Sequence, residues 1–160
     1  MFNKKGQLNS VDLLISTTVF ALLIVFLIGF WFVEIMDIQK ITKKTELEAQ
    51  AISLSDILIK SPGVPKNWEN ENSEEINMIG LASSDNIIDE DKVKKFINMS
   101  YSENKEIFGI ENDFYFYIED LNGNRLYQTG NSTIEKQSVT VTRFGVLDNI
   151  EVKMRLIVHG

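Results

Sequence analysis

The sequence of 160 residues contains no cysteine, a single histidine and two prolines. The absence of cysteine excludes disulfide bonds, thiolate catalysis and cysteine-ligated metal sites. It does not identify the cell compartment, since many exported proteins lack disulfides. The only histidine is His159, so no histidine pair is available for a zinc site. Its place next to the last residue predicts a frayed chain end.

Other patterns that carry catalysis are also missing. G-x-G does not occur, so there is no phosphate-binding glycine loop, and the serines have no histidine base. The acidic residues of 85–91 and of 120–124 are candidates for a calcium site, but neither stretch has EF-hand spacing. A helix start and a hairpin turn account for them better. We expect no catalytic residue, cofactor or metal, and no enzymatic activity.

No charged side chain occurs between Asp12 and Glu34. The 21 residues in question, Leu13 to Val33, read LLISTTVFALLIVFLIGFWFV. At about 1.5 Å per residue a helix of this length spans roughly 31 Å, close to the hydrocarbon thickness of a bilayer. We therefore expect a transmembrane helix within residues 7–33. The alternative is a buried core helix of a soluble protein, which is usually shorter.

Lysines flank the apolar run on both sides. A secretory signal has an apolar core of about 7–15 residues and then a small-residue cleavage site, whereas this run is longer and ends in Phe30 to Val33. We expect the helix to be retained as an anchor. Lys4 and Lys5 favour a cytoplasmic N-terminus, and the three lysines of residues 40–44 oppose it. We expect a single-pass protein of the cell membrane, with its N-terminus on the cytoplasmic side and its C-terminal domain outside.

The remainder of the chain is acidic. Of 23 acidic residues only Asp12 precedes Glu34, and of 16 basic residues only Lys4 and Lys5 do, which leaves 22 acidic and 14 basic side chains and a net charge of −8. Such a domain repels nucleic acid, so we expect no nucleic-acid partner. Asn98 and Asn131 begin N-x-S/T triplets and are candidate glycosylation sites, which agrees with an outer location.

The segment Lys4-Lys5-Gly6-Gln7-Leu8, followed by a charge-poor apolar helix, resembles the class III signal of archaeal type IV pilin-like proteins. The resemblance covers about 30 residues directly. It implies that a prepilin-type peptidase cuts between Gly6 and Gln7, so that residues 1–6 form a leader. It also implies that the helix anchors the chain and then packs with copies of itself or with other pilin-like subunits. The alternative is that Lys4 and Lys5 only mark the cytoplasmic side of the helix and that Gly6-Gln7 is incidental.

The sequence departs from that family at one position. Pilins that assemble usually carry an acidic residue at the fifth mature position, where this chain has Val11 and the acid follows at Asp12. Asp12 is the candidate assembly residue, and filament formation stays open. The sequence predicts a single-pass, membrane-anchored, pilin-like or pseudopilin surface protein with a structural, assembly or adhesion role. The alternative is a single-pass receptor, or an accessory subunit of a membrane complex, whose outer domain binds a ligand or partner.

The helix continues beyond the apolar run. No helix breaker appears between Val33 and Ser61-Pro62-Gly63, and four apolar residues at spacings of 4, 3 and 4 share one helical face. These residues are Leu47, Ala51, Leu54 and Leu58. We expect one helix from about Ser10 to Lys60, with residues 34–61 amphipathic and packed on the domain. A coiled-coil stalk is the alternative, but it needs three or four heptads and about two are present.

The pattern of residues 62–160 predicts an α+β domain similar to the pilin fold. Its antiparallel sheet has about four or five strands and is covered on one side by the long helix. Within Phe114 to Tyr117 we expect one alternating pair of aromatics in the core and the other exposed as a contact surface. Trp68 is expected to pin the loop of residues 66–75. The expected strands are 76–82, 114–118, 125–128, 138–144 and 150–158, the helices 89–98 and 101–108, and the turns 84–89, Asn122-Gly123 and Asp148-Asn149.

Overall fold

The computed structural model describes the backbone of residues 4–133 and 137–160, and their side chains apart from 4–10, 33, 34 and 36–40. The chain is α+β and divides into two compact units, Met1–Thr42 and Lys43–Gly160. Each unit is described by itself.

Helix α1 (Lys4–Lys60) is one continuous helix of 57 residues, as the sequence predicts, although it begins earlier than Ser10. It ends directly before Ser61-Pro62, where proline restricts the preceding residue to extended backbone. In the first unit Thr17 and Thr18 donate their hydroxyls to the carbonyls of Leu13 at 2.7 Å and Leu14 at 2.8 Å. These bonds satisfy the polar side chains inside the apolar stretch.

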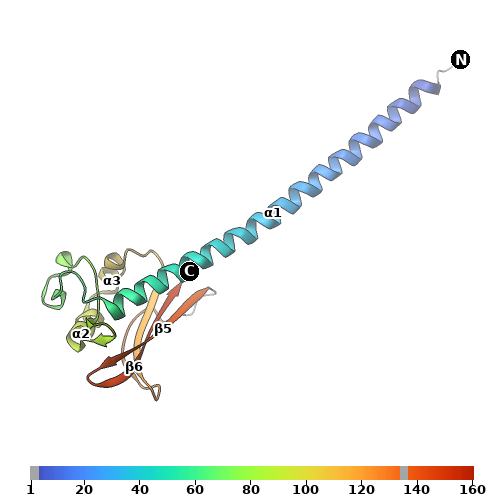
Figure 1. Ribbon diagram of the computed structural model, residues 1–160. Helices are drawn as coiled ribbons and strands as arrows, with labels where there is room; N and C mark the ends of the chain where they lie inside the picture. Colours follow the sequence, from blue (N-terminus) through green and yellow to red (C-terminus); the bar gives the residue numbers. More distant parts are fainter. Residues whose placement is uncertain (1–3, 134–136) are drawn as a thin grey trace. The chain divides into compact units, whose positions relative to one another are not determined.

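The second unit contains a curled mixed sheet of six strands in the order β1-β2-β5-β6-β3-β4 (Figure 1). The prediction of a purely antiparallel sheet of four or five strands is wrong, because β2 pairs in parallel with β5. Asn86, at a φ of 61°, directly precedes β2. The Asn86 carbonyl accepts from the Val146 N–H at 2.9 Å, which sets β2 beside β5. The strands are β1 (Ala82–Ser84), β2 (Ile87–Ile88), β3 (Phe114–Asp120), β4 (Arg125–Gly130), β5 (Ser138–Leu147) and β6 (Ile150–His159).

Both predicted hairpin turns are confirmed. Gly123 joins β3 to β4 with a φ of 90°, a conformation that glycine adopts without strain. Asp148 and Asn149 join β5 to β6 with φ values of 48° and 63°, which suits the right-handed twist of an antiparallel pair. The β3, β4, β5 and β6 regions are all predicted as strands, and all four run longer than expected.

The predicted strand over residues 76–82 is wrong, apart from its last residue, which starts β1. The last two of its backbone donors turn to the end of α1, where Leu81 donates to Leu58 at 2.9 Å and Ala82 to Ser61 at 3.1 Å, while Asn77 and Met78 donate to the Val64 carbonyl. A Cβ on Gly80 would lie 2.2 Å from the Ser61 carbonyl oxygen, so only glycine allows this approach. The apolar run therefore caps the helix end rather than forming a ladder.

Two short 3-10 helices, η1 (Trp68–Asn70) and η2 (Ser73–Glu75), precede the α-helices α2 (Glu90–Asn98) and α3 (Tyr101–Phe108). Trp68 is fully buried and donates its indole N–H to the Gly80 carbonyl at 2.8 Å, which confirms that the indole pins its loop. Asp89 caps α2, and Ser100 with Glu103 forms a capping box at the start of α3. Gly109, at a φ of 63°, ends α3.

The core lies between the sheet and three helical segments, α2, α3 and the part of α1 after Lys43 (Figure 1). All four residues of the predicted α1 stripe, Leu47, Ala51, Leu54 and Leu58, are buried. They join a cluster with Phe96 of α2 and the inward-facing side chains of β3 and β6. This confirms that the second half of α1 is part of the domain core.

Two predictions about exposure are wrong. His159 is not frayed: it ends β6, and its side chain is 3% exposed. Its backbone N–H donates to the Asp113 carbonyl at 2.7 Å. Phe114 and Phe116 fill the core as expected, but Tyr115 and Tyr117 are also buried. The arginine of the neighbouring strand lies over both tyrosine rings and removes them from solvent.

Candidate functional site

The apolar part of α1 is the first candidate. Among the described residues one helix, over Val11–Phe32, is long and apolar enough to cross a membrane, and none of its 22 residues is buried within the protein. Leu27 and Trp31 are 56% and 66% exposed. Contiguous apolar surface of this extent is rare on soluble monomers and fits contact with lipid or another apolar surface. By length and composition such a helix suits either a membrane span or a signal sequence.

The residues predicted for processing and assembly lie at the start of this helix. Gly6 and Gln7 are within α1, and their side chains are outside the described part of the structure. Asp12 is exposed, directly after Val11, which is 56% exposed. Asp12 therefore sits at the boundary where the charge-free stretch begins.

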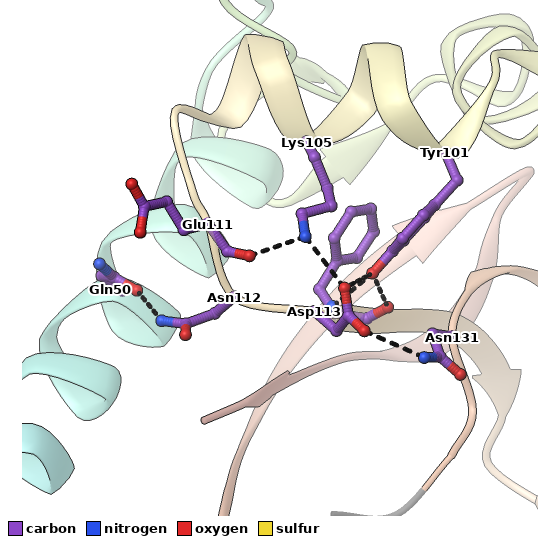
Figure 2. A network of polar contacts seen from close by, with 8 residues as sticks. Gln50, Tyr101, Lys105, Glu111, Asn112, Asp113 and Asn131 are labelled. Carbon is purple, nitrogen blue, oxygen red and sulfur yellow. Dashed lines mark hydrogen bonds and ion pairs between the residues drawn. The ribbon is translucent and has the colours of Figure 1, made fainter.

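A network of polar contacts surrounds Asp113 in the second unit (Figure 2). The Asp113 carboxylate accepts from the Tyr101 hydroxyl at 3.0 Å, from Lys105 at 2.9 Å and from the Asn131 amide at 3.1 Å. The hydrogen bond from Lys105, followed by those from Asn131 and Tyr101, lowers the pKa of the Asp113 carboxyl. Burial raises the pKa of Tyr101.

The network also ties the start of β3 to its surroundings. Lys105 donates to the Glu111 carbonyl at 2.7 Å, and the Asn112 amide donates to Gln50 of α1 at 3.1 Å (Figure 2). The carboxylate has three donors, and the ammonium donates to one carboxylate and one carbonyl. We interpret the network as a structural clamp between α1, α3 and β3.

The two candidate glycosylation residues differ in their surroundings. Asn98 is exposed in the last turn of α2, and Ser100 of its triplet caps α3. Asn131 is half-buried: its amide donates to Asp113, and its side-chain oxygen accepts from the Thr133 N–H at 3.0 Å. Both triplets are therefore tied to the folded structure through one of their members.

A second cluster on the sheet was not anticipated. We call Tyr115, Tyr117, Arg125, Gln128 and Arg155 the tyrosine–arginine surface. The Arg125 guanidinium carbon lies 4.6 Å from the Tyr117 ring centroid, and Arg125 donates to the Tyr115 hydroxyl at 3.1 Å. That hydroxyl donates to Gln128 at 2.8 Å. The hairpin register, which sets Arg125 opposite Glu119, was the sequence signal that could have revealed the cluster.

Lys92 is a buried charge of the kind that often marks a site. Its side chain is 3% exposed, and burial lowers its pKa. The ammonium donates to three backbone carbonyls, those of Pro62 at 2.6 Å, Lys66 at 2.8 Å and Ala82 at 3.5 Å. All three donors of the ammonium are used in this way, so Lys92 holds the loop and has no donor left for a ligand.

Over residues 4–133 and 137–160, no group of three or more histidine, cysteine or acidic side chains is placed to hold a metal ion. These features define a class: an α+β protein with one N-terminal apolar helix of membrane-spanning length and a curled mixed sheet. Comparisons of the chain with known protein families, with curated proteins and with solved structures found no match in any of the three.

Proposed function

We propose that this protein is a single-pass, membrane-anchored, pilin-like surface subunit without enzymatic activity. The observation that carries the proposal is the continuity of α1. One helix contains the Lys4 to Gln7 segment, the apolar stretch Val11–Phe32 and the stripe from Leu47 to Leu58 that the domain buries. The same helix thus contributes to both the proposed anchor and the domain core.

The proposal includes removal of residues 1–6 by a prepilin-type peptidase acting on the cytoplasmic side. Cutting between Gly6 and Gln7 leaves the apolar stretch attached. Cutting after the apolar stretch, as in secretion, would fall within α1. The second unit, with its exposed Asn98, lies outside the cell in this proposal.

Assembly with copies of itself or with other pilin-like subunits gives the apolar stretch its second role. Packing helices against one another buries apolar side chains that are otherwise exposed. A carboxylate in such an apolar setting needs a cationic partner. In the proposal the Asp12 carboxylate meets the new amino terminus of a neighbouring Gln7.

The competing proposal is a single-pass receptor or accessory subunit of a membrane complex. The exposed Arg125 of the tyrosine–arginine surface favours it, because arginine is common at the centres of binding surfaces. Here the chain stays in the membrane with a different membrane protein, and its outer domain binds a ligand or partner.

Electron microscopy of sheared surface material separates the two proposals. Gold-labelled antibodies against the second unit should decorate filaments if the chain is a pilin-like subunit. Label confined to membrane fragments, together with purification in a fixed ratio with another membrane protein, would contradict the pilin-like proposal and support the accessory one.

A further inference from the structure

The two faces of the sheet differ. Phe114, Phe116 and the even-numbered residues of β6 from Val152 to Val158 point into the core. The opposite face carries the tyrosine–arginine surface on β3, β4 and β6, and it is open to solvent at Arg125 and at Phe144, which is 65% exposed. A charged and aromatic sheet face of this kind is suited to contact with another macromolecule.

Arg125 is the prominent cation of this face. Two tyrosine rings and a hydrogen bond hold it, at 4.6 Å and 5.8 Å from the ring centroids and 3.1 Å from the Tyr115 hydroxyl. Over the described residues no carboxylate forms an ion pair with Arg125, whereas Arg155 is paired with Glu119 at 3.0 Å. Part of the ordering cost of binding is thus met in the free protein, as at many binding hot spots.

A groove whose negative charge is complementary to Arg125 is present on the same chain. A groove of about 480 Å³ lies between η2 and α3 and is lined by Glu74, Glu103 and Glu106 together with Ile76 and Ile107. Hydrogen bonds from Ser100 and Ser73 lower the pKa of Glu103 to about 2, so its carboxylate is charged at neutral pH. Glu74 and Glu106 are exposed. Carboxylates beside apolar side chains match a guanidinium and the apolar rim around it.

A single copy cannot join these two surfaces, because one lies on the outward side of β3, β4 and β6 and the other is formed by η2 and α3. We propose that Arg125 of one copy docks in the groove of Glu74, Glu103 and Glu106 on a second copy. The inference rests on the proposed function and names the contact between outer domains. It uses two different surfaces, so in the filament of the proposed function it repeats from one copy to the next.

The test uses full-length protein in the cells that produce it, with sheared filaments quantified by electron microscopy and immunoblotting. Arg125→Glu and Glu106→Arg should each lower the filament yield by about tenfold or more, since each places like charges in contact. When the two variants are produced together, a Glu106→Arg copy offers an arginine to the glutamate of an Arg125→Glu copy, beside the remaining Glu74 and Glu103, so the yield should rise clearly above that of either variant alone. Lys60→Glu makes the same charge change on the exposed last residue of α1 and should leave the yield unchanged.

The outcomes separate the contact from the proposed function. Absence of filaments from the wild-type chain contradicts the proposed function and the contact with it. Normal filament yield from both single variants overturns the contact while the proposed function stands. Failure of the mixture to recover also overturns it, provided both variants retain the wild-type fluorescence of buried Trp68.

Discussion

The ammonium nitrogen of Lys92 lies 2.6 Å from the carbonyl oxygen of Pro62, thirty positions earlier in the chain. The same nitrogen also reaches the carbonyls of Lys66 and Ala82. Lys92 thereby fixes the loop between α1 and α2, which contains buried Trp68. A backbone carbonyl buried without a donor is costly, so this one side chain stabilises the loop at three carbonyls.

Lys92→Met should destabilise the second unit by about 1–3 kcal/mol, because methionine keeps the apolar stem but offers the carbonyls no donor. Urea unfolding of the full chain in detergent, followed by Trp68 fluorescence in a Trp31→Phe background, measures the loss. Lys94→Met is the control: Lys94 is exposed and pairs with Glu90 on the same helix, so its loss should cost less than about 1 kcal/mol. Equal losses of stability in the two variants would contradict a stabilising role for the hydrogen bonds from Lys92 to the carbonyls.

Acid should weaken the structure partly through Glu103. Its folded pKa of about 2 lies below the ordinary value of 4.5 because Ser100 and Ser73 hydrogen-bond to the ionised form. The stability that Glu103 contributes is therefore complete above about pH 4.5 and is lost as the pH falls toward 2. Glu103→Gln should be less stable at pH 7 and lose less stability between pH 5 and pH 2, as measured by urea unfolding at each pH.

The control for that experiment is Glu75→Gln, an exposed glutamate of η2 whose side chain makes no hydrogen bond or ion pair among the described residues. Its stability at pH 7 should match the wild type. An unchanged pH dependence in Glu103→Gln would contradict the role given to the capping carboxylate.

His159→Leu should raise the stability of the second unit by about 1 kcal/mol. The imidazole is 3% exposed, and neither ring nitrogen has a hydrogen-bond partner among residues 4–133 and 137–160. Leucine fills a similar volume without unsatisfied polar atoms. Thermal unfolding by circular dichroism measures the change, and His159→Asn, which stays polar, should not gain. A clear loss of stability in His159→Leu would indicate that the ring has a polar role.

Local signals in the sequence were sufficient for much of the fold. Ser100 and Glu103 mark the start of α3, and Asn122-Gly123 marks a hairpin, because capping and turn geometry depend on a few adjacent residues. The helical stripe from Leu47 to Leu58 was visible for the same reason, since its period lies within one segment.

The errors arose where distant contacts decide the structure. Ile79 and Leu81 have the apolar spacing of a strand, but the carbonyls at the end of α1 take the backbone donors there. Ile87 and Ile88 form a strand only because Asn86 positions them beside Val146 and Leu147, and two residues show no periodicity. The sheet was therefore predicted as antiparallel instead of mixed.

The candidate sites show the same division. The apolar stretch was evident from the absence of charge, whereas the tyrosine–arginine surface depends on Arg125 crossing from β4 to the rings of β3. Tyr115 and Tyr117 were expected to be exposed because their strand was considered alone. The roles of Gly6, Gln7 and Asp12 stay predictions from the sequence.

The most direct test of the central proposal is the intact mass of the full-length protein purified from the membranes of the cells that produce it. Processing at the proposed site predicts a chain that begins at Gln7 and keeps the apolar stretch. Replacing Gly6 by a bulky residue such as phenylalanine should make the longer, unprocessed form accumulate. A chain that starts only at Met1, or one cut after Phe32, would contradict a pilin-like anchor.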